Sequence, residues 1–331
     1  MTFKLLSRLA SIVVWATMLG MSSSAALAQN YPTKPVRLIL SFPPGGGTDI
    51  LGRTVSQKLF EKWNQPVVVD NRAGGNGVIG ARAAITAAPD GYTLYVGSSD
   101  HMILGPNLFS NLPYDTLRDL MPVTSLANQY YILVVHPLVP AKSVQEFIAL
   151  AKAKPGVLNF VSPGTGTGGH LTGEFFQTMT RVKLTHVPYK GSAPAIADLL
   201  GGRDVTTSFA SMASVVPHIK SGRLRALALT SKSRLKALPD VMTTAEAGLP
   251  QLVVYSWNGV FAPMGTSKAL VDRVSADING ILRMTDVAER LGGLGLDPTG
   301  GTPEEFTAIV KSDLERWGKI IKDSGIEKSQ L

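Results

Sequence analysis

The chain has 331 residues, no cysteine and a formal net charge of +8, from 32 Lys and Arg against 24 Asp and Glu. The lack of cysteine excludes disulfides and a lipid anchor on cysteine. The basic residues are scattered and form no run or aromatic-interleaved stripe, which argues against a nucleic-acid partner. A mildly basic surface instead suits attraction of a small anionic ligand.

The first 28 residues have the composition of a secretory signal peptide. Lys4 and Arg8 form a basic start, residues 9–21 an apolar core, and Ala26-Leu27-Ala28 a small-residue cleavage site. Cleavage after Ala28 leaves 303 residues (331 minus 28), enough for two domains. Export without cysteine, and without a later long apolar segment, predicts a protein of the bacterial periplasm.

The first predicted unit of the mature chain is a strand, a glycine-rich loop and a helix. The apolar, β-branched run 36–42 is typical of a buried strand. Two prolines and three glycines follow, and Thr48 or Asp49 is expected to cap a helix with apolar Leu51, Val55 and Leu59 at helical spacing. Free N–H groups and the helix dipole then favour an anion at the loop. The alternative is a plain turn that needs glycine only for its geometry.

Further strands and helices alternate along the next part of the chain. A short strand over 66–70, a helix over 78–87 and a strand over 92–96 are predicted. The last of these ends in a polar tip, 97–101, and such tips in open α/β sheets are where ligands collect. The alternation predicts parallel α/β sheets.

A second strand, glycine-rich loop and helix follows a strongly apolar strand over 130–136. It consists of the strand 158–161, the loop 162–169 and a helix that includes His170. Strands over 186–189, 205–209 and 224–230 complete a second sheet, and 253–261 is expected to be a return strand. Helices over 267–284 and 303–322 end the chain, the last with a capping box at Thr302 and Glu305.

These elements predict an α/β protein of two lobes. One lobe comprises residues 30–128 plus 256–331 and the other residues 129–255, with one glycine-rich loop from each facing a common cleft. Residues near Asn128 and Trp257 are expected to act as hinges when the lobes close.

Patterns for catalysis, nucleotides and metals are weak. Gly164-x-Gly166-x-x-Gly169 matches the dinucleotide fingerprint, but the acid expected about 20 residues later is missing. The first loop lacks the Gly-Lys-Ser/Thr of a phosphate-binding loop, no Gly-x-Ser-x-Gly is present, and the five His are isolated. We therefore expect no cofactor, no metal and no catalytic residue.

Short motifs along the whole mature chain resemble the Bug (TctC-like) family of tripartite tricarboxylate transporter substrate-binding proteins. They are residues 31–39, 42–49, 65–72, 89–94, 112–115, 187–191, 198–202, 217–219, 224–227, 245–248 and 302–306. The resemblance implies a two-lobed periplasmic binding protein fold of type II, closing like a Venus flytrap. It also implies capture of a small di- or tricarboxylate by a monomer, and delivery to transporter subunits in the inner membrane.

The loops and the resemblance together predict the ligand contacts. They are Phe42, Pro43, Pro44, Gly45, Gly46, Gly47, Thr48, Asp49, Ser98, Ser99, Gly164, Thr165, Gly166, Thr167, His170, Tyr189, Ser208 and Ala210. Packing is the alternative for Tyr189, and helix capping for Asp49. Many relatives have an acid where this chain has Ala210, and its absence favours a plain or aromatic dicarboxylate over an amino acid. A sensor that uses the same cleft, or an exported enzyme, remains as an alternative function.

Overall fold

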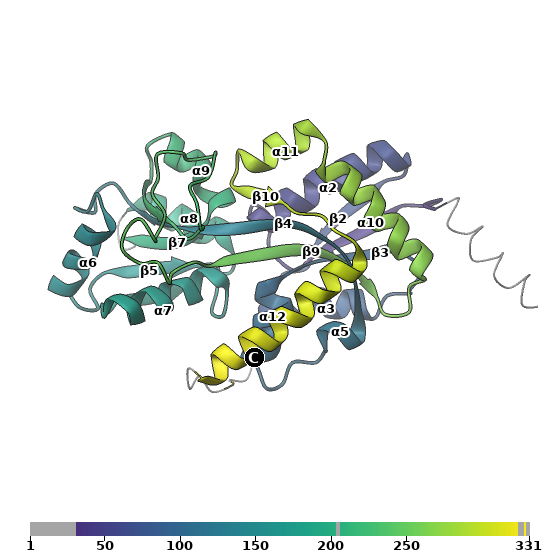
Figure 1. The fold of residues 1–331 in the computed structure, drawn as a ribbon, viewed down its shortest axis with the longest axis horizontal. Helices are drawn as coiled ribbons and strands as arrows, with labels where there is room; N and C mark the ends of the chain where they lie inside the picture. Colours follow the sequence, from purple (N-terminus) through teal and green to yellow (C-terminus); the bar gives the residue numbers. More distant parts are fainter. Residues whose placement is uncertain (1–30, 203–205, 324–327, 329–331) are drawn as a thin grey trace, which may run out of the picture.

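The structure, a computed structural model, describes residues 31–202, 206–323 and 328, so the predicted signal peptide and its cleavage site lie outside the described residues. Two α/β lobes lie side by side, and the long strands β4 (Leu120–Val135) and β9 (Tyr255–Pro263) run along the line that joins them (Figure 1). Within the described residues, no helix has both the length and the apolar character needed to span a membrane.

Lobe 1 contains both ends of the described chain. Its sheet has the order β2-β1-β3-β9-β4, with β10 also on β4; β1 is parallel to β2 and β3, whereas β9 is antiparallel to β3 and β4. Besides β4 and β9, the elements of lobe 1 are β1 (Val36–Leu40), α2 (Gly47–Trp63), β2 (Val67–Asn71), η1 (Gly75–Gly77), α3 (Val78–Ile85), β3 (Thr93–Ser98), η2 (Asp100–Leu104), α4 (Gly105–Leu108), α5 (Thr116–Asp119), α10 (Lys268–Leu282), α11 (Thr285–Gly292), β10 (Leu296–Pro298) and α12 (Pro303–Asp323).

Lobe 2 is built on the second half of β4. This half pairs antiparallel with β7 and β8, and β5 is parallel to β7 and β6. Besides this half of β4, the elements of lobe 2 are α6 (Val144–Ala153), β5 (Asn159–Ser162), α7 (Gly168–Thr180), β6 (Thr185–Pro188), α8 (Ser192–Gly201), β7 (Thr207–Ser211), α9 (Met212–Lys220) and β8 (Arg225–Leu229).

The strand β4 changes partners between two adjacent tyrosines. Tyr130 is the last residue paired with β9, opposite Tyr255, and Tyr131 is the first paired with β7, opposite Ser211. The change lies two residues beyond the predicted boundary at 128/129, and the exact lobe limits stay a prediction. The expectation of parallel sheets was wrong for these crossing strands, because β4 leaves lobe 1 while β9 returns to it in the opposite direction.

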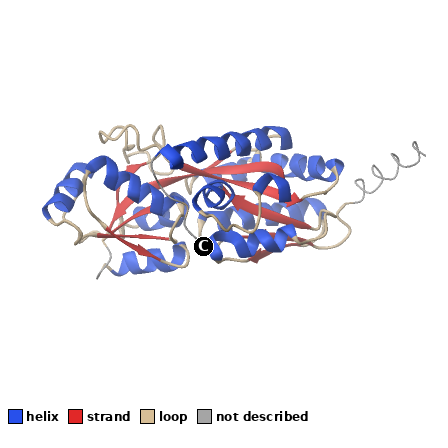
Figure 2. Cartoon of the chain, turned by 90° about the horizontal axis from the view of Figure 1, so that it is seen from below, coloured by secondary structure: helices blue, strands red, loops and turns tan. Residues whose placement is uncertain are grey.

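Helices cover the faces of the strands in both lobes, as the second view shows (Figure 2). In lobe 1, Leu51, Val55 and Leu59 of α2 are fully buried against strand residues such as Leu38, at the predicted helical spacing. The predicted capping box is confirmed: Thr302 N donates to Glu305 Oε2 (2.8 Å), and Glu305 N donates to Thr302 Oγ1 (3.1 Å). The packing of α2 fixes the helix that follows the first glycine-rich loop against the sheet of lobe 1.

Candidate functional site

The first glycine-rich loop joins β1 to α2. The helix begins at Gly47 with Gly46 as its N-cap, so the prediction that Thr48 or Asp49 caps it was wrong. The carboxylate of Asp49 turns back into the loop, where it accepts from Gly45 N (3.1 Å), Arg53 Nε (3.0 Å) and Asn71 Nδ2 (2.9 Å). Burial alone would raise the pKa of Asp49, but these hydrogen bonds outweigh it and lower the pKa. Asp49 therefore holds the loop in shape as an anion.

The N-terminus of α2 lies close against β4. A Cβ atom on Gly47 would lie 1.9 Å from Gln129 Oε1 and 3.1 Å from Ser211 Oγ. Glycine, which has no Cβ, lets the helix begin this close to the end of the Gln129 side chain. The first N–H groups of α2, which have no intrahelical acceptor, are thereby brought beside polar side chains of both lobes.

The second glycine-rich loop joins β5 to α7. Thr167 is the N-cap residue, and its Oγ1 donates to Gly164 O (2.7 Å) inside the loop. A Cβ on Gly168, the first helical residue, would lie 1.9 Å from the hydroxyl oxygen of Tyr131. The Gly168 N–H donates to Asp100 Oδ2 (2.8 Å), a carboxylate that comes from lobe 1.

The two lobes touch in this structure. A Cβ on Gly191 of lobe 2 would lie 2.6 Å from Pro43 Cγ of lobe 1, and one on Gly46 would lie 3.4 Å from Ser192 Oγ. With the hydrogen bond between Asp100 and Gly168, these contacts close the cleft around a cavity. The structure therefore represents a closed arrangement of the lobes.

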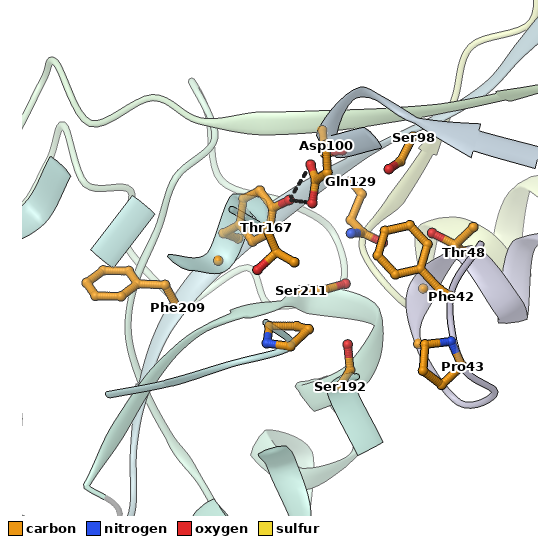
Figure 3. Close-up of a pocket in the computed structure, with 16 residues that line it drawn as sticks. Phe42, Pro43, Thr48, Ser98, Asp100, Gln129, Thr167, Ser192, Phe209 and Ser211 are labelled. Carbon is orange, nitrogen blue, oxygen red and sulfur yellow. Dashed lines mark hydrogen bonds between the residues drawn. The ribbon is translucent and has the colours of Figure 1, made fainter. Parts of the chain in front are cut away.

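The enclosed space, which we call the inner cavity, has a volume of about 30 Å³ and is lined by both lobes (Figure 3). Lobe 1 and the strands that join the lobes contribute Phe42, Pro43, Gly46, Gly47, Thr48, Ser98, Asp100, Gln129, Tyr131 and Ser256; lobe 2 contributes Pro163, Thr167, Gly169, Ser192, Phe209 and Ser211.

A wider space, which we call the outer groove, shares Phe42, Pro43, Pro163 and Thr167 with the inner cavity. It has a volume of about 450 Å³ and is lined by Ser41, Phe42, Pro43, residues 73–77, His101, Pro163, Gly164, Thr167 and residues 189–191. Phe42 stacks on the buried His101 ring with centroids 4.3 Å apart, and His101 Nδ1 lies 2.8 Å from Ser41 Oγ. Burial lowers the pKa of His101 to about 3, so a neutral imidazole supports Phe42 between the two spaces.

Several polar atoms of the inner cavity are buried and unpaired. Ser98 Oγ, Gln129 Oε1 and Ser211 Oγ have no hydrogen-bond partner within the described protein. Asn258 Nδ2, next to the cavity, is also unpaired, while Asn258 Oδ1 accepts from Thr48 Oγ1 (2.7 Å). A buried unpaired group costs about 1–3 kcal/mol, so such a cluster is typical of a site that a polar ligand completes.

The inner cavity carries a single charged side chain among the described residues that line it, that of Asp100. Its Oδ1 and Oδ2 lie 3.4 and 3.5 Å from the Tyr131 hydroxyl. Burial raises the pKa of Asp100, although the Gly168 N–H, Ser256 and Tyr131 partly oppose this. An anion in this cavity would therefore be held by neutral hydroxyl and N–H donors of the described lining residues.

Nine of the predicted ligand contacts line one of the two spaces. Phe42, Pro43, Gly46, Gly47, Thr48, Ser98 and Thr167 line the inner cavity, and Gly164 and Tyr189 line the outer groove. The Tyr189 hydroxyl is hydrogen-bonded to Asp198, which raises the pKa of Tyr189 to about 12.

The other predicted contacts point elsewhere in this closed arrangement. Pro44, Gly45 and Thr165 are exposed, Ser99 Oγ lies 2.9 Å from Ser256 Oγ, and Ser208 Oγ donates to Val161 O (2.9 Å). Gly166 N donates to His170 Nδ1 (3.1 Å), and the His170 ring stacks on His186 with centroids 4.1 Å apart. Asp49 is used in its own loop, as described above.

Ala210 belongs to an apolar cluster with Ile132 and Val215 and is 3% exposed. Side chains alternate along β7, so Ser211 lies on the opposite face of the strand from Ala210 and lines the cavity instead. Although position 210 is not acidic, the cleft does contain an acid, because Asp100 lines the inner cavity.

Sequence reasoning did not find Asp100, Gln129, Tyr131, Ser192, Ser211 and Ser256 as cavity residues. Asp100 belongs to the polar tip after β3, which was predicted as a place where ligands collect. Ser211 could have been found from strand alternation, had the predicted strand been extended two residues beyond Phe209. Gln129 and Ser256 lie on the crossing strands, whose course along the cleft depends on the tertiary structure.

A family model described as "Tripartite tricarboxylate transporter family receptor" matches residues 51–326. Protein BugT of Bordetella pertussis is 37% identical over 318 residues, which cover 96% of this chain and 97% of BugT. The chain belongs to this receptor family. The predicted family is thereby confirmed.

Solved structures similar to this receptor include two with bound carboxylates. Rpa4515 of R. palustris with adipate has a TM-score of 0.87 and 34% identity, covering 90% of this chain and all of the other. MatC from Rhodopseudomonas palustris with bound malate has a TM-score of 0.82 and 29% identity, covering 88% of this chain and all of the other. The predicted two-lobed α/β periplasmic binding protein fold is confirmed, and the family consists of substrate-binding receptors rather than enzymes.

Proposed function

We propose that this receptor captures a small di- or tricarboxylate in the inner cavity. The carrying observation is the pair of buried unpaired hydroxyls, Ser98 Oγ and Ser211 Oγ, which line the inner cavity together with the N-terminus of α2. Hydroxyl donors and free backbone N–H groups at a helix N-terminus suit a carboxylate, and preorganised neutral donors hold it without an arginine. The adipate and malate bound to similar proteins support this ligand class.

The receptor is proposed to act in the periplasm, as a monomer, and to present its cargo to the membrane subunits of a tripartite transporter. The composition of residues 1–28 and the description of the family support this placement. The closed cavity, about 30 Å³, has room for only one or two waters, so the lobes must separate to admit a ligand and must stay farther apart around it than they are here. The crossing strands β4 and β9, near Asn128 and Trp257, are the proposed hinges.

A thermal-shift screen of the chain from Gln29 onward tests the ligand class. The panel comprises mono-, di- and tricarboxylates, aromatic ones included, with neutral amides of the same carbon skeletons as controls. Binding to the folded state raises the apparent stability in proportion to the logarithm of ligand excess. We expect a shift with a carboxylate and none with its amide. A panel without any shift, or consumption of the compound that binds, contradicts the proposed function.

A further inference from the structure

Asp100 places a carboxylate in the wall of the inner cavity. It follows the carboxyl end of β3, is 9% exposed, and lines the cavity together with Ser98 and Ser256. Its Oδ2 accepts from Gly168 N (2.8 Å) at the start of α7, and both oxygens lie near the Tyr131 hydroxyl. The N-terminus of α7, which could bind an anion, therefore already holds the Asp100 carboxyl of the protein itself.

Among the described residues that line the cavity, none offers the Asp100 carboxyl a cationic partner. The α7 N-terminus offsets its charge in part, through the Gly168 N–H and the helix dipole. A ligand carboxylate pressed against Asp100 would be disfavoured, because two carboxylates that share a buried site cannot both stay ionised where water is excluded. The unpaired hydroxyls of Ser98 and Ser211, together with the first backbone N–H groups of α2, offer a carboxylate a place on the cavity wall instead.

We infer that Asp100 selects cargo in which a hydrogen-bond donor, a protonated amine or a hydroxyl, stands beside the bound carboxylate. The inference rests on the proposed function, since it assumes a carboxylate in the inner cavity. The donor reaches Asp100 while the carboxylate lies on the α2 side of the cavity. This orientation satisfies the buried acid and the buried hydroxyls at once. The cargo class is then an amino- or hydroxy-substituted carboxylate.

Titration calorimetry with matched ligands tests the selection. Succinate is compared with aspartate and malate, glutarate with glutamate and α-hydroxyglutarate, and adipate with α-aminoadipate. Any other carboxylate that binds is paired in the same way with its α-amino and α-hydroxy analogues. We expect the donor-bearing member of a pair that binds to be at least about tenfold tighter than the unsubstituted member, the effect of one hydrogen bond to a charged group.

The variant Asp100→Asn should remove this preference, because its amide oxygen can still accept from Gly168 N while the charge is lost. Asp277→Asn is the matched control: Asp277 is a buried carboxylate of lobe 1 that accepts from Trp63 Nε1 (2.7 Å), and it does not line the inner cavity. The control should keep the wild-type ratio of affinities.

Two results overturn the inference. One is that the wild-type receptor binds the unsubstituted acid as tightly as its donor-bearing analogues. This result alone overturns the inference, even if a variant fails to fold. The other is the same affinity ratio in Asp100→Asn as in Asp277→Asn. Both results leave carboxylate binding intact, whereas the absence of binding by every carboxylate contradicts the proposed function itself.

Discussion

The helix N-termini that follow the two glycine-rich loops face different chemical partners. In lobe 1, Asp49 in the first turn of α2 turns away from the cleft to Gly45, Arg53 and Asn71, and leaves the helix start facing the cavity. In lobe 2, the first turn of α7 has no acid of its own, and Asp100 of lobe 1 accepts from Gly168 N. The two similar local sequences therefore give different sites. The N-terminus of α2 is open to an anion, whereas the N-terminus of α7 is partly occupied by Asp100.

The tightest packing in this comparison is at the start of α7. In Gly168→Ala the new Cβ would meet the hydroxyl of Tyr131, which is 3% exposed and has little room to move. We expect the free energy of unfolding in urea to fall by about 1–3 kcal/mol. In the control Gly280→Ala, no atom lies within 4 Å of the new Cβ. This control should gain up to about 1 kcal/mol from helix propensity, and equal effects at the two positions would contradict the packing argument.

A substitution at the open site beside α2 is expected to lower the ligand affinity without lowering the stability of the fold. Ser211→Ala removes a buried hydroxyl that has no partner, so the ligand-free receptor should be at least as stable as the wild type, while ligand affinity falls about tenfold. Calorimetry and urea unfolding measure the two effects. Ser56→Ala is the control, because its hydroxyl donates to Val67 O (2.5 Å) away from the cleft. It should lose stability and keep its affinity, and the opposite pattern would refute this assignment.

The occupied site beside α7 predicts a dependence of stability on pH. Burial raises the pKa of Asp100 above its ordinary value of about 4, so the folded state holds this proton more tightly than the unfolded state does. The stability of the wild type relative to Asp100→Asn should therefore decrease as the pH rises from about 4 through the raised pKa. Thermal unfolding of both proteins across this range measures the slope. A difference that is constant, or that increases with pH, would show that the carboxylate is not destabilised by burial.

The smallest effect is expected for Gly47→Ala. Its new Cβ would meet the end of the Gln129 side chain, which can turn away, unlike the ring of Tyr131. We expect the free energy of unfolding to change by less than about 1 kcal/mol. A loss as large as that of Gly168→Ala would remove the distinction between the two helix starts.

Local patterns were enough to predict the two strand, loop and helix units, because each depends on residues close together in sequence. The burial of Leu51, Val55 and Leu59 and the capping box at Thr302 are examples. Phe42, Pro43 and Thr48 were predicted at the cleft for the same reason, since the loop that carries them follows a buried strand directly.

The remaining cavity residues depend on contacts distant in sequence. Gln129 reaches the cavity only because β4 continues from one lobe into the other, and Asp100 approaches Gly168 only when the lobes are together. Ala210 was expected at the ligand because many relatives have an acid at this position, but the alternation of β7 puts Ser211 at the cavity instead. Tertiary register, rather than residue type, decides these positions.

A crystal structure of the receptor with the carboxylate that gives the largest thermal shift tests the central claim most directly. The account predicts the ligand in the inner cavity, with one carboxylate within about 3 Å of Ser98 Oγ, Ser211 Oγ and the first N–H groups of α2. Density for the ligand only in the outer groove, between Phe42 and Tyr189, would contradict it.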